Sequence, residues 1–227
     1  MVAQYDAISP SNEALTLGEL GCFISHLKAW GTLLNEGDDW GFIVEDDVHL
    51  GEGIGELLSS KNWIPEGVEI VNAETVGVTV RMSSRSIGEA NSRSLRVVRS
   101  FQSGSGGYFL SKQGARRLIE IAKLQCVPVD HFLFSPSFSR IHRLKTAQLD
   151  PAACIQDSVL TKGVFFSSML DSERSSIDPS DPRTHKLSGP AKLRREVRRV
   201  AMQAWNVLLF VIDQFLRTNV WRSVPFK

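Results

Sequence analysis

A short apolar run that ends in three consecutive carboxylates is the feature of this sequence that most constrains its fold. The run extends from Trp40 to Val44, and Glu45, Asp46 and Asp47 follow it directly. Such a run predicts a buried strand, and in open α/β sheets ligands bind beyond the carboxyl ends of the strands. Alternation along a continuing strand predicts that Glu45 and Asp47 share one face and that Asp46 points elsewhere.

The crowding of these three acidic side chains also suggests a chemistry. Adjacent carboxylates repel one another, and a hard divalent cation relieves that repulsion. Mg²⁺ or Mn²⁺ held by one or two carboxylates and by the phosphates of a substrate is a common way to bind a diphosphate. The alternative is an exposed turn that carries solvated charge. The triplet is therefore a candidate metal site.

The remaining apolar pattern predicts an α/β fold with a mixed sheet. Apolar residues at intervals of three and four predict a helix over residues 18–35, and Thr16 and Glu19 have the spacing of a capping box. Ser111 can cap a second helix that ends near Lys123. An amphipathic stretch is expected at 52–60, and strand-like runs occur at 68–71, 76–82, 95–98 and 108–110.

The C-terminal part of the chain differs in composition. We expect a folded domain at residues 1–166, a Ser-, Asp- and Pro-rich linker or mobile loop at 167–190, and a basic amphipathic helix at 191–227. The helix is too short and too polar to span a bilayer. We expect residues 191–222 to lie on an anionic membrane surface, with aromatic side chains that include Trp205 and Trp221 in the acyl boundary. Packing on the same domain or on a second copy is the alternative.

Composition excludes several classes of protein. The 26 basic and 25 acidic residues give a net charge of +1, so a general affinity for nucleic acid is not expected. The three cysteines show no C-x-x-C pairing, which argues against a disulfide framework and favours a reducing compartment. The first residues show no basic start followed by an apolar run. A cytoplasmic location, with peripheral attachment to the inner face of the membrane, is therefore expected.

Four separated motifs resemble glycosyltransferase family 25, the lipopolysaccharide-biosynthesis group. They are LTLGELGCFISHLKAW at 15–30, FIVEDDV at 42–48, GSGGYFLSKQGARRL at 104–118 and PVDHFL at 128–133. Their order and spacing match as well. The resemblance covers residues 12–160. The sequence departs from the family pattern at its start, where we expect the strand-helix-strand unit that usually precedes the first motif to be missing.

The resemblance implies both a fold and an activity. The fold would be a GT-A-like mixed-sheet α/β sandwich. The activity would be inverting transfer of a sugar, commonly galactose, from a UDP-sugar donor to a saccharide or lipid-linked saccharide acceptor in lipopolysaccharide or capsule biosynthesis. In such an enzyme the acidic motif binds Mn²⁺ or Mg²⁺, which stabilises the charge on the departing nucleotide.

The resemblance also suggests roles for individual residues. Asp47 is the best candidate metal ligand, assisted by Glu45 and by His131, although a lone histidine is often structural. Asp130 is the candidate base for the acceptor hydroxyl, with a helix N-cap as its alternative, and Asp157 is a second candidate for base or metal contact. Tyr108 is a sugar-stacking residue or a core aromatic. The candidate donor-binding residues are Glu45, Asp46, Ser25, His26, Gly106 and Tyr108.

Two other functions remain open from the sequence. The chain could be a catalytically inactive, truncated remnant that binds a carbohydrate or a partner protein. It could also be a metal-dependent phosphohydrolase that activates water, but the ligands of a two-metal site are not clustered in the sequence.

Overall fold

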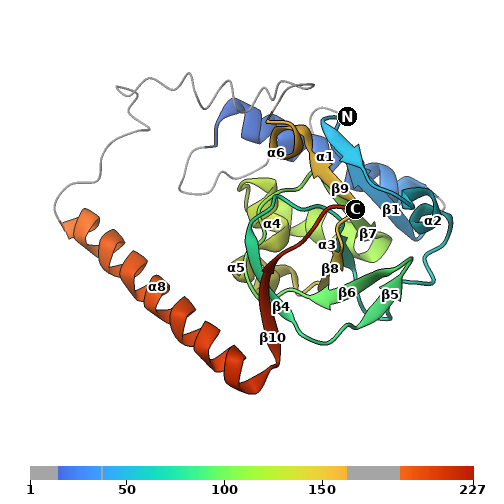
Figure 1. Cartoon of the computed structure of the whole chain (residues 1–227). Coiled ribbons are helices and arrows are strands. Elements are labelled where there is room, and N and C mark those ends of the chain that lie inside the picture. The colour runs from blue at the N-terminus through green and yellow to red at the C-terminus, as the bar shows by residue number, and fades with distance from the viewer. Residues whose placement is uncertain (1–14, 37, 163–189) are drawn as a thin grey trace.

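The computed structural model describes residues 15–36, 38–162 and 190–227 and is built around a six-stranded mixed sheet (Figure 1). The strand order is β1-β7-β3-β8-β6-β5. The parallel set is β1 (Trp40–Val44), β3 (Ile70–Asn72) and β8 (Thr146–Asp150), and the antiparallel neighbours are β7 (Gly107–Ser111) and β6 (Arg93–Val97). Strand β5 (Gly88–Ala90) closes one edge beside β6. The carboxyl ends of β1, β3 and β8 therefore meet at the same end of the sheet as the start of β7.

Two apolar cores lie on the two faces of this sheet. On one face the core includes Phe23, Trp30, Leu118 and Phe132, which come from α1 (Leu17–Asn35), α3 (Lys112–Ala122) and α4 (Val129–Phe134). On the other face the core includes Leu57 of α2 (Ile54–Ser59). Strand β7 serves both cores, because Tyr108 and Leu110 point into the first and Phe109 into the second. This period of two is the one expected of a fully buried strand.

The two predicted helices are confirmed together with their caps. Thr16 is the N-cap of α1, and its hydroxyl accepts the Glu19 amide at 3.1 Å while Glu19 accepts the Thr16 amide at 3.0 Å. Ser111 caps α3 by accepting the Gly114 amide at 2.9 Å. The predicted strand runs correspond to β3, β4 (Thr79–Ser83), β6 and β7, and the 52–60 stretch contains α2. Helix α5 (Pro136–His142) and strands β2 (Val48–Leu50), β5, β8 and β9 (Cys154–Gln156) were not predicted.

The C-terminal helix is shorter than the sequence pattern suggested. Helix α8 (Pro190–Leu216) ends before Arg217, which has a left-handed backbone with φ of 52°, and the chain then forms β10 (Asn219–Ser223) antiparallel to β4. The expectation that Trp221 belongs to a membrane-facing helix is therefore wrong, since it lies in β10. Most of the predicted linker at 167–190 lies outside the described residues. Within the described part of the chain, no helix is long and apolar enough to cross a membrane.

The residues after β10 return to the body of the protein. The Thr75 hydroxyl donates to the Val224 carbonyl at 2.7 Å, and the Ala152 amide donates to the Pro225 carbonyl at 2.8 Å. Val224 is buried with Val80 and Met82 in a small third core. This segment therefore closes the surface beside the carboxyl ends of β3 and β8.

Candidate functional site

The end of the sheet where β1 and β3 finish and β7 begins gathers several acidic residues. Glu45 follows β1 directly, and Glu74 lies two residues after β3. The amide of Glu45 donates to the Gly106 carbonyl at 2.9 Å, and the amide of Gly106 donates to Glu74 Oε2 at 2.6 Å. The backbone of Gly106, just before β7, thus binds the backbone of Glu45 and the carboxylate of Glu74.

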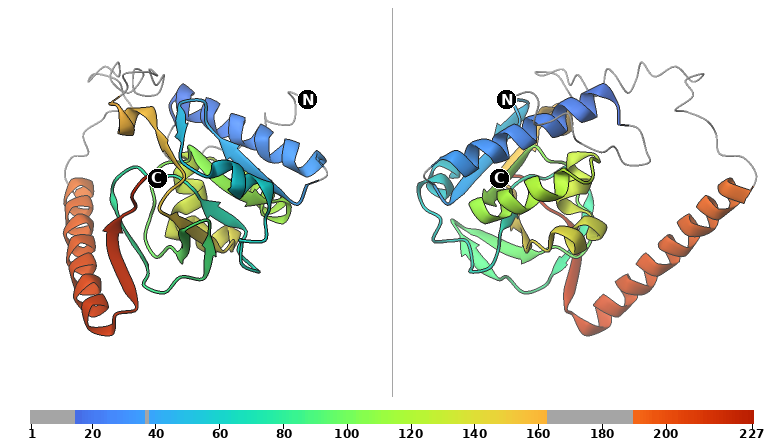
Figure 2. Two further views of the ribbon diagram at one scale, coloured as in Figure 1. Left: turned by 45° about the vertical axis from the view of Figure 1, so that its right-hand side comes forward. Right: turned by 180° about the vertical axis from the view of Figure 1, so that it is seen from behind.

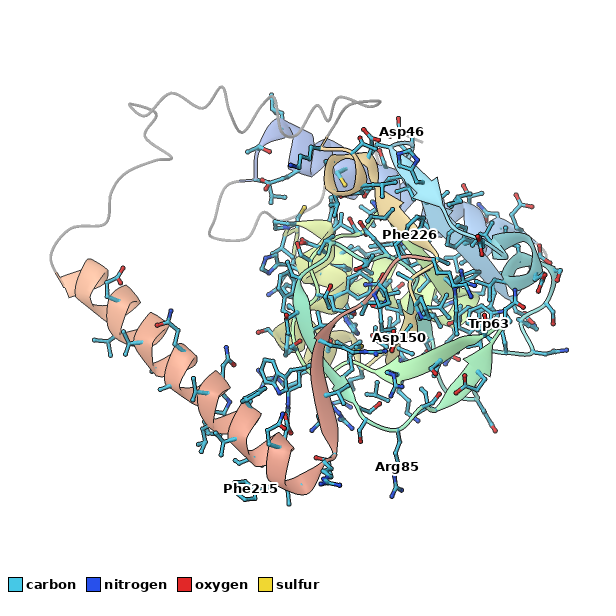
Figure 3. The ribbon with its side chains drawn as sticks, in the orientation of Figure 1. Asp46, Trp63, Arg85, Asp150, Phe215 and Phe226 are labelled. Carbon is cyan, nitrogen blue, oxygen red and sulfur yellow. The ribbon has the colours of Figure 1, made fainter. Side chains whose placement is uncertain are left out.

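The acidic triplet forms a turn between two strands. Strand β1 ends at Val44 and β2 begins at Val48, so the argument from strand alternation does not apply to Glu45, Asp46 and Asp47. Glu45 and Asp47 are nevertheless the partly buried members, whereas Asp46 is exposed at the surface (Figure 3). The exposed-turn alternative therefore describes only Asp46.

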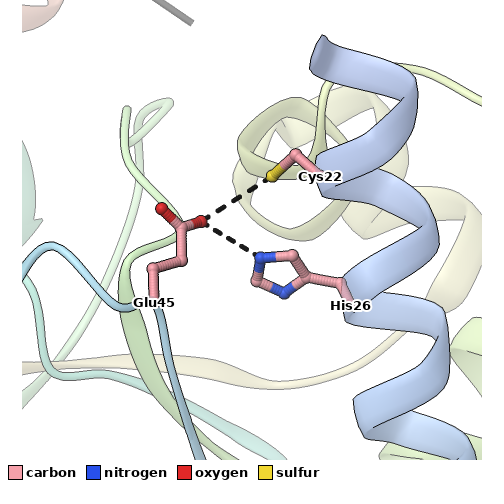
Figure 4. Close-up of side chains that lie close together, drawn as sticks. All are labelled: Cys22, His26 and Glu45. Atoms are coloured by element: carbon pink, nitrogen blue, oxygen red, sulfur yellow. Dashed lines mark hydrogen bonds and ion pairs between the residues drawn. The ribbon is translucent and has the colours of Figure 1, made fainter. Parts of the chain in front are cut away.

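Glu45 is the centre of a hydrogen-bonded network with helix α1 (Figure 4). Its Oε1 atom accepts His26 Nε2–H at 3.1 Å and the Ser105 hydroxyl at 3.0 Å, and it lies 3.8 Å from the Cys22 thiol. Its Oε2 atom accepts the Gln156 side-chain amide at 3.0 Å. Burial alone would raise the pKa of Glu45, but the hydrogen bonds from His26, Ser105 and Gln156 outweigh it and lower the pKa. Glu45 is therefore held as a carboxylate.

A buried chain of donors orients His26 toward Glu45. The Trp30 indole can only donate, and it donates to the Tyr108 hydroxyl at 2.7 Å. The Tyr108 hydroxyl lies 2.7 Å from His26 Nδ1. Because the Glu45 carboxylate can only accept, this order assigns the neutral His26 ring a proton on Nε2 and a hydrogen bond from Tyr108 on Nδ1.

These hydrogen bonds change the interpretation of Tyr108 and His26. Tyr108 is 0% exposed and His26 is 4% exposed, so neither ring offers a surface to a sugar. The core-aromatic interpretation of Tyr108 is the one that agrees with the structure. Both residues act in the structure as supports that position Glu45.

Asp47 and Glu74 have carboxylate oxygens that are buried without a hydrogen-bond partner among the described residues. These atoms are Oδ1 of Asp47 and Oε1 of Glu74. Burial raises the pKa of Asp47, and the charges of Glu45 and Asp46 raise it further. Burial raises the pKa of Glu74 to about 8, with further contributions from Glu45, Asp47 and Asp130. Buried polar atoms without partners are rare in native proteins, and each one needs an explanation.

Glu74 was not predicted from the sequence. Its signal was the same as that of Glu45, namely a carboxylate directly after an apolar run, here the stretch that ends in Ala73. Two glycines permit its close packing. A Cβ at Gly104 would lie 2.7 Å from Glu74 Oε2, and a Cβ at Gly106 would lie 3.2 Å from Glu74 Oε1 and 2.9 Å from Val48. Gly106 therefore packs against Glu74, and its contact with a donor stays a prediction.

Other predicted site residues lie at the margin of this cluster or outside it. Asp130 is at the second position of α4, whose N-cap is Pro128, so the N-cap alternative is wrong. Its carboxylate accepts hydrogen bonds from the His131 amide at 2.7 Å and from the Ser103 hydroxyl at 3.4 Å. The negative charge of Asp130 contributes to the raised pKa of Glu74 and of Cys22. His131 is exposed and stacks on Phe101, with ring centroids 4.4 Å apart.

Ser25 and Asp157 do not present free side chains to the cluster. Ser25 is exposed, and its hydroxyl donates to the Gly21 carbonyl within α1. Asp157 begins α6 (Asp157–Leu160), is 0% exposed, and lies 2.7 Å from His49 Nε2 and 2.7 Å from the Thr161 hydroxyl. Its amide donates to the Asp47 carbonyl at 2.9 Å. Asp157 therefore fixes the backbone of the acidic turn, and its carboxylate is enclosed together with His49 and Thr161.

The residues present fit a hard divalent cation. Carboxylate oxygens are the ligands that Mg²⁺ and Mn²⁺ prefer, and Asp47 and Glu74 each offer a buried oxygen without a partner. Among the described residues, the atoms of Cys22, His26 and Glu45 also lie within 4.8 Å of one another, but hydrogen bonds already occupy both nitrogens of His26 and both oxygens of Glu45. Burial and the Glu45 charge also raise the pKa of the Cys22 thiol to about 12. We therefore interpret that trio as a support.

Comparison with known proteins places this site in a family. The family model described as "Glycosyltransferase family 25 (LPS biosynthesis protein)" matches residues 2–133. The lipooligosaccharide biosynthesis protein lex-1 of Haemophilus influenzae is 33% identical over 66% of this chain and 55% of its own length. The lacto-N-neotetraose biosynthesis glycosyltransferase LgtB of Neisseria meningitidis serogroup B is 32% identical over 61% of this chain and 54% of its own length.

A further relative matches over a larger share of both chains. The lipooligosaccharide biosynthesis protein lic2B of Haemophilus influenzae is 26% identical over 86% of this chain and 84% of its own length. The chain spans little more than half of lex-1 and LgtB. The family match includes β1, the acidic turn, Glu74 and the glycines before β7. The chain therefore belongs to glycosyltransferase family 25.

Proposed function

We propose that this protein transfers a sugar, commonly galactose, from a UDP-sugar to a saccharide acceptor in lipopolysaccharide or capsule biosynthesis, with inversion at the anomeric carbon. The observation that carries this proposal is the set of carboxylates at one end of the sheet, two of which have buried oxygens without partners. Membership of the family and the names of its relatives agree with it.

In this proposal the carboxylates have separate tasks. Asp47 and Glu74 would hold Mn²⁺ or Mg²⁺, which when bound neutralises the charge on the diphosphate of the donor. Glu45 stays ionised through its four polar contacts and keeps the acidic turn in place. Asp46 is exposed beside them and is available to the donor.

Inversion requires a base for the acceptor hydroxyl, and Asp130 is our candidate. Its carboxylate is close enough to the cluster to raise the pKa of Glu74 and of Cys22, and its hydrogen bonds come from an adjacent amide and a serine hydroxyl. The three cysteines are free, in agreement with the proposed cytoplasmic face of the inner membrane as the place of transfer.

Calorimetric titration of the full chain with UDP, with and without Mn²⁺, tests the donor site. Asp47→Asn should weaken Mn²⁺-dependent UDP binding by about 100-fold, the upper end of what even supporting residues cost a metal site. Asp39→Asn is the matched control, because Asp39 precedes β1 at the opposite end of the same strand and pairs with Lys61 at 2.5 Å. Metal-independent UDP binding, or equal loss in both variants, would contradict the metal assignment. If the folded protein bound no UDP, the non-catalytic binding role would replace transfer.

A further inference from the structure

Helix α8 stands away from the rest of the protein along most of its length (Figure 2). Its 27 residues correspond to a length of about 40 Å. It is attached near its end through β10, which pairs with β4 of the body. A helix of this kind needs a partner for any apolar face that it presents.

The attachment of α8 fixes which side of the helix faces the body. Asp213 is buried, and its carboxylate accepts two hydrogen bonds from Arg81 at 2.6 and 2.8 Å. Asn219 and Trp221 of β10 also donate to it, at 2.8 and 2.7 Å. The Phe210 ring packs on Trp221 with centroids 6.3 Å apart. Asp213 and Phe210 therefore mark the inner side of the helix.

Most of the exposed apolar residues of α8 lie on the opposite side. Each residue turns the helix by about 100°, so Val211 and Phe215 point roughly 160° away from Asp213, and Leu208 about 140° away. Phe215 is 83% exposed, and Figure 3 shows it at the C-terminal end of the helix, next to the turn into β10. The exposed apolar residues that lie at least about 120° from Asp213 form this outer stripe, namely Val197, Val200, Val207, Leu208, Val211 and Phe215. Trp205, Ile212 and Leu216 are also exposed and flank the stripe, at about 60–100° from Asp213.

The charge of the helix indicates what covers this stripe. Its first part carries five basic residues and one acidic residue, Glu196, and the basic ones are Lys192, Arg194, Arg195, Arg198 and Arg199. A continuous apolar stripe beside basic residues is the pattern of helices that lie in the headgroup region of anionic membranes. A second copy packed parallel to this helix would bring the two basic first parts together, which disfavours that pairing. An antiparallel second copy is one of the outcomes that the test below distinguishes.

We propose that the outer stripe of α8 lies flat on a bilayer that contains anionic lipids, with Asp213 and β10 as the fixed link to the catalytic body. Phe215, Leu208 and Trp205 enter the acyl boundary, and the basic first part of the helix meets the headgroups. The helix lies in the interface and does not cross the membrane. The Asp213 contacts transmit the position of the helix to β4, so the body is held at a set orientation to the surface.

Vesicle co-sedimentation of the full chain tests this surface. Vesicles of phosphatidylglycerol and phosphatidylcholine should bind the protein, and pure phosphatidylcholine vesicles should bind it at least about tenfold more weakly. Raised salt should reduce binding to the anionic vesicles. The double variant Leu208→Glu, Phe215→Glu should lower binding at least about tenfold, because it places two charges in the apolar stripe.

The matched control is Leu124→Glu, which makes the same kind of change at a residue that is exposed outside α8. It should bind vesicles like the unmodified chain. Circular dichroism and UDP titration on the same samples separate a surface effect from unfolding or from failure of the donor site. Equal binding by the double variant, or a dimer that dissociates in the double variant while vesicles are ignored, would overturn the proposal in favour of a protein partner.

Discussion

At one end of the six-stranded sheet the carboxylates of Glu45, Asp47 and Glu74 lie close together, whereas at the other end charges of both signs line an open groove. The groove has a volume of about 840 Å³ and lies where β1, β3 and β8 begin. Its basic residues are Lys61, Lys112, Arg117, Arg143 and Lys145. Lys61 pairs with Asp39 at 2.5 Å, and Arg117 pairs with Glu69 at 3.5 Å.

The acidic end has no such compensation within the described residues. There, no lysine or arginine forms an ion pair with Glu45, Asp47 or Glu74, and the basic side chain in contact with Glu45 is that of His26. Uncompensated burial raises the pKa of Asp47 and of Glu74, and it costs stability. Such costs are common at functional sites, so the comparison marks the acidic end as the candidate for the chemistry proposed above.

The largest effect is expected from Glu74→Gln, which removes the charge of the most buried of these three carboxylates and keeps its shape. We expect Mn²⁺-dependent UDP binding to fall by about 100-fold. We also expect a gain in the free energy of unfolding at pH 8, on the order of 2 kcal/mol. Calorimetric titration and urea denaturation at several pH values measure the two effects.

The sign of the stability effect follows from the direction of the pKa shift. The ordinary pKa of 4.5 rises to about 8 in the folded protein, so folding favours the protonated form of Glu74. The penalty is absent below about pH 4.5 and grows as the pH rises to about 8, where it is complete. The free energy of unfolding of the Glu74→Gln variant should therefore increase relative to that of the unmodified chain between about pH 4.5 and pH 8. A constant difference across the range would show that Glu74 does not titrate as the structure indicates.

A smaller effect is expected from Tyr108→Phe, which removes one hydroxyl from the chain that orients His26. The indole N–H of Trp30 and Nδ1 of His26 would lose their partner in a buried place, at a cost of about 1–3 kcal/mol of stability. UDP binding should weaken by about tenfold, because Glu45 loses an oriented donor. Thermal unfolding and calorimetry measure both. Unchanged UDP binding in a destabilised variant would mean that the hydrogen bonds among Trp30, Tyr108 and His26 only stabilise the fold.

The smallest effect is expected at the opposite end of the sheet. Arg117→Gln removes a partly exposed ion pair with Glu69, and its cost should be below about 1 kcal/mol. UDP binding should not change. A loss of UDP affinity in this variant, measured in the same titration, would show that the groove contributes to the donor site and would remove the contrast between the two ends.

Some parts of this arrangement could be predicted from the sequence because their signals are local. Helix α1 shows its apolar stripe and its capping box within 20 residues of sequence. Strand β8 was missed because two of its four buried residues, Gln148 and Asp150, are polar and interrupt the apolar pattern. Gln148 accepts a hydrogen bond from the Gln102 side-chain amide, and Asp150 pairs with Arg96 at 2.9 Å. These partners are distant in sequence, so the apolar pattern alone does not reveal that the polar side chains of β8 can be buried.

The candidate site shows the same limit. Glu45 and Asp47 were identified because three carboxylates after a strand are conspicuous, but a single carboxylate such as Glu74 needs the pairing of β3 with β7 before it can be placed. For Asp157 the sequence suggests a chemical role, because it does not reveal that the carboxylate is enclosed by His49, which is 108 residues away. Local patterns identify candidates, and the strand pairing decides which of them meet.

The hydrogen bond from Thr75 to Val224 joins residues 149 positions apart in the chain, directly beside Glu74. Contacts of such long sequence separation form slowly, because closing a large loop costs entropy that nearby contacts must first repay. The surroundings of Glu74 are therefore complete only after residues 223–227 have docked. During synthesis the acidic end of the sheet would be the last part of the enzyme to become rigid.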